Sequence, residues 1–315
     1  MTIMTQSISA AIHIQGSTIR YAELEREDSA LHLRRFGQET VGGDVPQVLW
    51  GEDDGPNALE ETGAVVREAL GDTEAAALGL VVHPLDVYSF FMPVPTGLSE
   101  QERGQRVAHQ AALVTNTRSP DSLHTTFRSV RTAEAGGESI EWVYVLALPQ
   151  AVEGRLKPLV SALPVQDPVQ MVSAEAVARV MEHAGTEQTP PAENEGPFRL
   201  AIGQYSAHTE FSLTREGTWY HAHAVEEAQS PENRAYFAVG LLNRIGVPLR
   251  EIGRLFVYGP DADPGPNAAF ESIFDCSPEV LDPAEALPQM SGPSGEAPAG
   301  AYLPCIGGAL AAQAA

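Results

Sequence analysis

The stretch of sequence that decides the fold lies near the start: Ser9-Ala-Ala-Ile-His-Ile-Gln-Gly-Ser-Thr-Ile-Arg-Tyr-Ala-Glu-Leu24. Apolar residues flank Gln15-Gly16-Ser17, a sequence typical of a tight turn between two strands. A third segment, Leu31–Phe36, alternates apolar and polar residues, as a half-buried strand does. The three segments together predict a three-stranded meander.

A helix and a buried strand follow the meander. Apolar residues at helical spacing predict a helix from about Leu59 to Leu70, and Gly71 ends it. The wholly apolar run Ala77–Val82 is typical of a central strand that is covered on both faces. The chain therefore begins with the order β-β-β-α-β.

The same order returns in the second half of the chain. Three strands are predicted over residues 198–203, 208–215 and 218–225. A helix then begins after Ser230, and a buried strand over Arg254–Tyr258 completes the pattern.

The polar, proline-rich residues 185–197 predict a linker between the two halves. We therefore expect a first lobe over residues 1–184 and a second lobe over 198–315.

Residues from about 84 to 150 predict a small β-α-β-β subdomain inserted in the first lobe. Its first strand begins at Val87 and is expected to end at Pro93 and Pro95. A capping-box pattern at Ser99 predicts the helix, and two strands follow around a glycine-rich turn. The predicted fold is thus α/β and two-lobed, with mixed sheets and this insertion.

The chain is strongly acidic. It has 19 Lys and Arg against 42 Asp and Glu, so its formal net charge is −23. This charge argues against nucleic acid and anionic lipid surfaces as partners, because both require clustered cations. Lys157 is the single lysine, and an acid excess with so little lysine predicts adaptation to a salty cytoplasm.

The chain carries few signals for export or membrane insertion. Its two cysteines, Cys276 and Cys305, are too few for a disulfide framework or a structural zinc site. The start lacks the basic and apolar regions of a signal peptide, and apolar runs are far shorter than the roughly 20 residues that span a bilayer. A soluble, cytoplasmic protein is expected.

Three stretches carry a resemblance to a known family. Ala11–Leu24 aligns without gaps on the family's opening, Gly-Ile-Asp-Ile-Gly-Ser-Ser-Ser-Val-Lys-x-x-Glu-Leu, and Phe90–Glu102 resembles its entry into an inserted subdomain. Tyr302–Leu310 resembles its ending, Ala-Pro-Ala-Ile-Gly-Leu-Ala-Leu. With the doubled β-β-β-α-β order, these stretches resemble the type IV pilus assembly protein PilM family, within the actin-like (ribonuclease H-like) superfamily.

The resemblance implies where a nucleotide would bind. In that superfamily two hairpin loops hold the phosphates through backbone N–H groups, and an aspartate that opens each loop holds Mg²⁺. The matching positions of this chain, including the adenosine-side glycine, are His13, Gln15, Gly16, Ser17, Ala201, Gly203 and Gly259.

The departures from the family pattern fall on the metal ligands. His13 and Ala201 replace the two aspartates, and Gln15 replaces a glycine. Loss of both oxygen ligands removes the metal–phosphate clamp, so neither ATP hydrolysis nor a cofactor is expected. The surviving glycines and Ser17 are interpreted as hairpin and packing residues. Weak nucleotide binding without turnover stays open.

Two histidine patterns are candidates for metal binding. His221-Ala-His223 places two imidazoles on one face of a strand at a spacing that can hold zinc, with Glu226 and Glu227 close in sequence. His208-Thr-Glu210 is a weaker candidate. Because no third ligand has a diagnostic spacing, no metal is expected.

An apolar strand in the insertion is a candidate partner site. Alternation places Phe90 and Met92 on one face, with Tyr88 beside them. These residues form either subdomain core or one wall of a groove for a peptide. The resemblance implies a groove near this subdomain that captures the short cytoplasmic tail of a single-span inner-membrane protein.

Three functions compete at this point. The first is a non-catalytic scaffold of a type IV pilus or type II secretion-like assembly platform. Such a scaffold binds the tail of an inner-membrane partner, which attaches it to the inner membrane, and self-association is a further option. The second is an active ATPase or small-molecule kinase of the same superfamily. The third is an unrelated two-lobed binding protein, whose strand order would differ from two copies of one mixed sheet.

Overall fold

The opening meander belongs to a five-stranded mixed sheet, here called the first sheet. The computed structural model describes residues 6–27, 30–51, 58–160, 163, 165, 167–187, 196–227, 230–263, 268–287 and 299–314. The first sheet has the order β3-β2-β1-β4-β8, with β1 antiparallel to β2 and parallel to β4. Its strands are β1 (Gln6–Gln15), β2 (Thr18–Glu27), β3 (Ala30–Thr40), β4 (Ala77–Val82) and β8 (Val169–Val172).

The second half of the chain builds a second sheet of the same design, with the order β11-β10-β9-β12-β13. Its strands are β9 (Phe198–Gln204), β10 (Thr209–Arg215), β11 (Thr218–Val225), β12 (Ile252–Tyr258) and β13 (Pro278–Val280). In both sheets the first strand of the meander pairs with the second strand on one side and with the fourth, in parallel, on the other. The repeat predicted from the sequence is confirmed, and it contradicts the unrelated two-lobed alternative.

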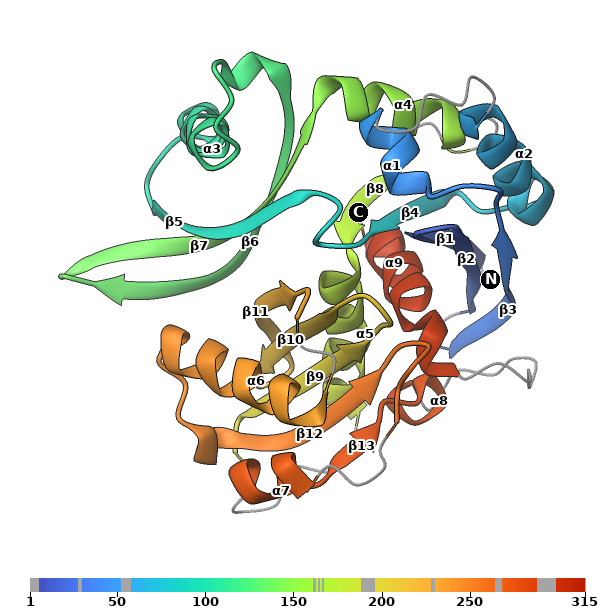
Figure 1. Ribbon diagram of the computed structural model, residues 1–315. Helices are drawn as coiled ribbons and strands as arrows, with labels where there is room; N and C mark the ends of the chain where they lie inside the picture. Colours follow the sequence, from blue (N-terminus) through green and yellow to red (C-terminus); the bar gives the residue numbers. More distant parts are fainter. Residues whose placement is uncertain are drawn as a thin grey trace, which may run out of the picture.

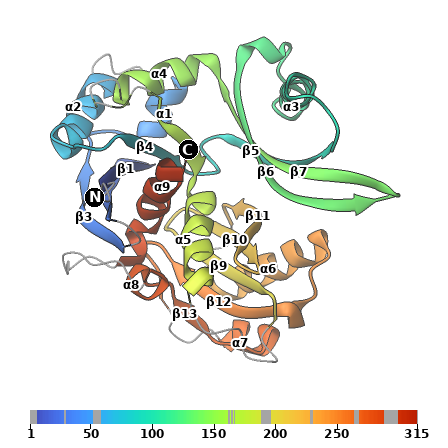
Figure 2. The same cartoon turned by 180° about the vertical axis from the view of Figure 1, so that it is seen from behind.

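The sheets and helices stack in layers (Figure 1). Along β1, Ile12 and Ile14 face an outer core, whereas Ala11 faces the layer between the sheets, as the alternation of a strand requires. The outer core of the first sheet contains α1 (Val45–Trp50), α2 (Ala58–Leu70) and α4 (Gln150–Val160), and that of the second contains α6 (Pro231–Ile245) and α7 (Ala268–Phe274). The layer between the sheets contains α5 (Ser173–Glu187) and α9 (Leu303–Ala314), as the view from behind also shows (Figure 2).

The two middle helices are exchanged between the halves of the chain. Helix α9 follows the second sheet in sequence but packs on β1 and β4, while α5 packs on β10 and β11. The two helices contact each other at Gly307, where a Cβ atom would lie 1.8 Å from the backbone oxygen of Ala176. Each half of the chain thus supplies one helix that covers the sheet of the other half. The lobe boundaries at 184 and 198 stay a prediction, and linker residues 188–195 lie outside the described residues.

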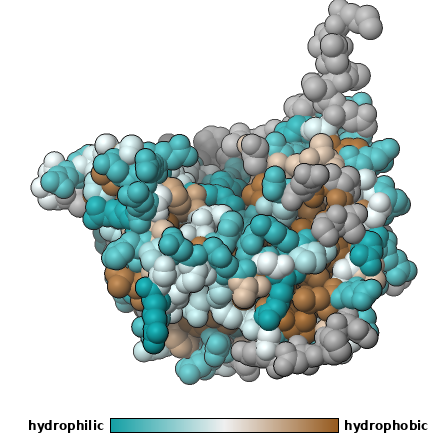
Figure 3. All heavy atoms as spheres, turned by 90° about the horizontal axis from the view of Figure 1, so that it is seen from above, coloured by the Kyte–Doolittle hydropathy of each residue, from teal (hydrophilic) through white to brown (hydrophobic). Residues whose placement is uncertain are grey.

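The insertion forms a separate three-stranded sheet in the order β5-β7-β6. It comprises β5 (Tyr88–Pro95), α3 (Glu100–Val114), β6 (Leu123–Ala135) and β7 (Glu138–Pro149). The predicted capping box is present, since Ser99 and Glu102 bond to each other's backbone N–H. The end of the β6–β7 hairpin projects from the molecule (Figure 1), and its surface is mainly hydrophilic (Figure 3).

One local prediction is wrong, and one helix was not predicted. Strand β5 continues through Pro93 and Pro95, because an edge strand tolerates residues that lack a backbone donor. The structure also contains α1, a helix that was not predicted from the sequence. It forms because Asp44 caps it at Gln47 N (3.0 Å) and Gly51 ends it with a left-handed backbone (φ 76°).

The remaining elements are short. They are α8 (Pro283–Ala286) and the 3₁₀ helices η1 (Pro120–Ser122), η2 (Leu249–Glu251) and η3 (Ala299–Tyr302). Among the described residues, no helix has both the length and the apolarity that a membrane span requires.

Candidate functional site

The two positions where the family has aspartates face the layer between the sheets. His13 on β1 and Ala201 on β9 are both fully buried. Both ring nitrogens of His13 lack a hydrogen-bond partner within the described structure. Neither position offers an oxygen ligand to a metal.

The first hairpin turn is occupied by contacts within the protein. The carbonyls of Gly16 and Ser17 accept hydrogen bonds from the backbone of Val45 (3.0 Å) and Val41 (2.9 Å). The side chain of Gln15 accepts a hydrogen bond from Arg20. Gly16 has a left-handed backbone (φ 54°), and a Cβ atom there would lie 3.6 Å from the carboxylate of Asp44. An acid beside this turn opposes a phosphate anion.

The glycines of the second half make close packing contacts. A Cβ atom on Gly203 would lie 2.6 Å from the ring of Tyr258, and one on Gly259 (φ 103°) would lie 2.5 Å from the backbone oxygen of Gln204. These contacts favour the interpretation of both glycines as packing residues.

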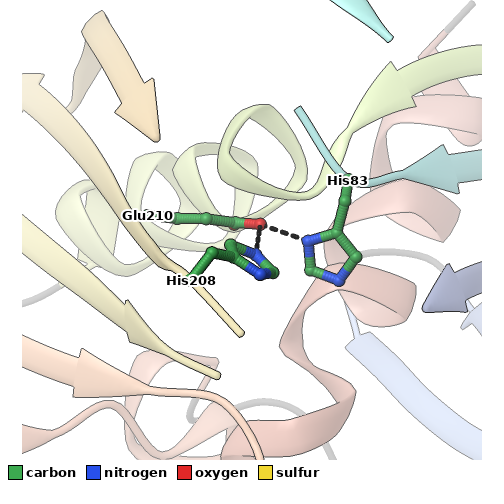
Figure 4. A group of neighbouring side chains, drawn as sticks. All are labelled: His83, His208 and Glu210. Atoms are coloured by element: carbon green, nitrogen blue, oxygen red, sulfur yellow. Dashed lines mark hydrogen bonds and ion pairs between the residues drawn. The ribbon is translucent and has the colours of Figure 1, made fainter. Parts of the chain in front are cut away.

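A buried cluster of polar side chains lies close to these positions. His83 follows β4 of the first sheet, whereas His208 and Glu210 come from the β9–β10 turn and β10 of the second (Figure 4). One oxygen of Glu210 lies 2.5 Å from His83 Nδ1 and 3.0 Å from His208 Nε2. The three side chains are between 0% and 6% exposed. The cluster therefore bridges the two sheets in a dry environment.

Further groups complete the cluster. Ser173 Oγ donates to the same oxygen of Glu210 (2.6 Å), and the Tyr258 hydroxyl donates to the other oxygen (3.0 Å). The ring of Tyr205 is stacked on His208, with centroids 4.7 Å apart and planes inclined by 9°. The hairpin that corresponds to a phosphate loop thus carries two rings packed into the interior.

Glu210 carries a negative charge inside the cluster. Burial alone would raise the pKa of Glu210, but His83 and the hydrogen bonds from His208 and His83 outweigh burial and hold the pKa well below its usual range. Burial raises the pKa of Tyr258 well above its usual value, and Glu210 raises it further. Burial, and then His83 and Arg20, lower the pKa of His13. Glu210 is therefore an ionised carboxylate whose charge the surrounding hydrogen-bond donors stabilise.

Sequence reasoning found only part of this cluster. It singled out His208 and Glu210 as a weak metal candidate but missed His83, Ser173 and Tyr258, which lie far away in sequence. A signal existed for His83, because it directly follows the buried parallel strand β4, and polar residues at the carboxyl ends of such strands often form sites.

The other histidine pair lies elsewhere, on β11. Burial, and then neighbouring cations, lower the pKa of His221 to about 3 and that of His223 to about 4. Arg131 and Arg244 contribute to the lowering at His221 and oppose a bound metal cation there. Among the described residues, no third metal-ligating side chain joins this pair.

This pair lines a cavity of about 660 Å³ between the inserted subdomain, β11 and the end of α6. Phe90 lines the cavity together with further aromatic side chains and with Arg131 and Arg244. The aromatic residues besides Phe90 are Phe91, Trp142 and Tyr144.

The three residues proposed for a groove do not lie together. Phe90 lines the cavity and also packs against the subdomain core, in which Met92, only 7% exposed, lies with Val107 of α3. Tyr88 packs edge-on against Trp50, with ring centroids 5.7 Å apart.

Comparison with solved structures identifies the fold. A Bacteroides thetaiotaomicron protein with an actin-like ATPase fold and unknown function matches with a TM-score of 0.53 and 9% identity, covering 88% of this chain and 92% of its own. This chain has the actin-like ATPase fold. It also resembles a chain of a PilM-PilN type IV pilus biogenesis complex, with a TM-score of 0.65 and 13% identity, over 98% of this chain and 99% of that one.

The sequence comparisons add no family assignment. No protein-family model matches the sequence, and no curated protein matches it. The predicted resemblance to PilM is confirmed at the level of the fold.

Proposed function

We propose that this chain is a non-catalytic scaffold of a type IV pilus or type II secretion-like assembly platform, located in the cytoplasm. Its role is to bind the cytoplasmic tail of an inner-membrane partner. The likeness in fold to a chain of a PilM-PilN complex over 98% of the sequence supports this function.

The packing between the two sheets is the observation that most strongly supports a scaffold without catalytic activity. His13 and Ala201, at the expected metal-ligand positions, are buried, and neither carries a carboxylate. Glu210 accepts four hydrogen bonds from protein groups and is 0% exposed. A triphosphate with its Mg²⁺ needs both oxygen ligands and space. His13 and Ala201 supply no carboxylate oxygen, and the oxygens of Glu210 are already taken up by protein donors in a packed, buried layer.

The cavity beside the inserted subdomain supports the binding part. Its aromatic walls suit apolar side chains of an extended segment, and its two arginines suit carbonyl or carboxylate oxygens. We assign the partner's tail to this cavity, with Phe90 as an anchor.

The first prediction concerns this anchor. Phe90→Ala is expected to weaken binding of the tail at least about tenfold, because aromatic residues in desolvated pockets carry much of the binding energy. The probe is a synthetic peptide of the cytoplasmic tail of a short single-span protein, which this function predicts to be encoded directly downstream, and it is titrated by calorimetry. Arg244→Ala, which changes the cavity from the α6 side, is expected to weaken binding as well.

The matched control is Leu113→Ala on α3, because Leu113 is 64% exposed and does not line the cavity. It is expected to bind as wild type does. A peptide that binds neither the wild type nor the variants contradicts the tethering function. Equal binding to all four proteins contradicts the assignment of the cavity.

A further inference from the structure

The polar cluster between the sheets has the composition of a transition-metal site. One ligand atom from each of His83, His208 and Glu210 lies within 4.8 Å of the other two, and all three residues are buried. Two imidazoles and one carboxylate form a ligand set that zinc binds in proteins, whereas Mg²⁺ and Ca²⁺ prefer oxygen ligands alone.

The cluster and its neighbour His13 contain buried polar atoms that no described protein group satisfies. His83 Nε2 and both ring nitrogens of His13 are buried without a hydrogen-bond partner in the described structure. The rings of His13 and His83 lie 4.9 Å apart between centroids, so His13 is a further nitrogen donor beside the cluster. Unpartnered buried polar atoms are uncommon, and a bound ion or water is a usual explanation for them.

The orientation of the ligands is already fixed by neighbouring groups. Tyr258 and Ser173 each donate a hydrogen bond to Glu210, and Tyr205 stacks on His208. Such outer groups hold the ligands of metal sites in a single geometry.

The dimensions allow an ion after a small adjustment. Metal–ligand bonds of about 2.1 Å place the ligand atoms of a tetrahedral zinc site about 3.4 Å apart. The distance between His83 Nδ1 and Glu210 is 2.5 Å, so these two groups must separate by roughly 1 Å. When the metal binds, the two ligand nitrogens no longer carry protons, and each neutral imidazole keeps one proton on its other ring nitrogen.

From this geometry we propose that His83, His208 and Glu210 bind one zinc ion, which joins the end of β4 in the first sheet to the β9–β10 hairpin in the second. The ion connects the lobes where the resemblance implies a nucleotide in other members of the superfamily. This site is independent of the partner tail, so its test and that of the tail have separate outcomes.

The test uses the full chain, purified without a histidine tag in metal-free buffer. Titration with Zn²⁺ is expected to reach one ion per chain and to raise the melting temperature, whereas Mg²⁺ raises it little. Tyr258→Phe is expected to weaken zinc binding about 10- to 100-fold, as loss of an outer hydrogen bond does. Glu210→Gln, which removes a ligand charge with little change in shape, is expected to weaken it further.

The matched control is His109→Ala, because His109 is an exposed histidine on α3. This variant is expected to bind zinc as wild type does. If Glu210→Gln does not fold, X-ray absorption spectroscopy of the zinc-loaded wild type identifies the ligands of the ion. Two imidazoles and no sulfur are expected among them. Failure of the wild type to bind zinc, equal binding by a folded Glu210→Gln variant, or a ligand shell without imidazole would overturn the proposal.

Discussion

Glu210→Ala is expected to lower the free energy of unfolding of the metal-free protein by about 3–5 kcal/mol, the range found when one partner of a buried charged network is removed. The carboxylate accepts hydrogen bonds from His83, His208, Ser173 and Tyr258, and all four donors would lose their acceptor. Denaturant unfolding followed by circular dichroism measures the change. Exposed Glu216 provides the control, since Glu216→Ala is expected to change stability by no more than about 0.5 kcal/mol.

The same carboxylate predicts a pH dependence. Because the pKa of Glu210 is lowered in the folded protein, its contribution is present above the unfolded pKa of about 4.3 and is lost as the pH falls below that value. His13 and His221 also have lowered pKa values, so their contributions begin to decline below about pH 6.5. Glu210→Ala is expected to remove the loss of stability that occurs below about pH 4.3 and to keep the decline that begins near pH 6.5. A variant that keeps the full loss of stability below pH 4.3 contradicts this assignment.

Gly307→Ala is expected to destabilise the protein by about 3 kcal/mol, at the upper end of the usual cost of overpacking. A Cβ atom at this position would lie 1.8 Å from the backbone oxygen of Ala176, and backbone of α5 cannot move aside as a flexible side chain does. The added methyl group must therefore separate α5 from α9, the two helices that fill the layer between the sheets. Thermal and denaturant unfolding measure the effect.

Gly240→Ala is the matched control for the helix substitution. Gly240 lies in α6, and a Cβ atom there would meet no atom within 4 Å. Its replacement is expected to be neutral or to stabilise the protein by about 0.5–1 kcal/mol, because alanine has the higher helix propensity. Equal effects of the two substitutions would contradict the close α5–α9 contact.

Local patterns in the sequence were sufficient to predict much of the fold. The apolar alternation around Gly16, the buried run Ala77–Val82 and their recurrence after residue 197 predicted two sheets of one design. The exchange of α5 and α9 was not predictable in this way, because helical periodicity indicates that a face is buried but not which sheet covers it. The path of β5 through Pro93 was missed for a similar reason, since tolerance of proline depends on the strand lying at a sheet edge.

The candidate site was harder to predict than the fold. The replacements at His13 and Ala201 indicated a lost metal–phosphate clamp, but no pattern revealed what fills that space. His83, Ser173 and Tyr258 reach Glu210 only because β4, α5 and β12 converge between the sheets. Convergence of distant segments depends on tertiary packing, and the spacing of residues within one segment does not encode it.

Calorimetric titration of the full chain with Mg·ATP, paired with a phosphate-release assay, tests the central claim most directly. The packed layer around His13, Ala201 and Glu210 predicts no saturable binding at sub-millimolar nucleotide and no release of phosphate above background. Sub-millimolar affinity that depends on Mg²⁺, together with steady phosphate release, would contradict the account and favour an active ATPase.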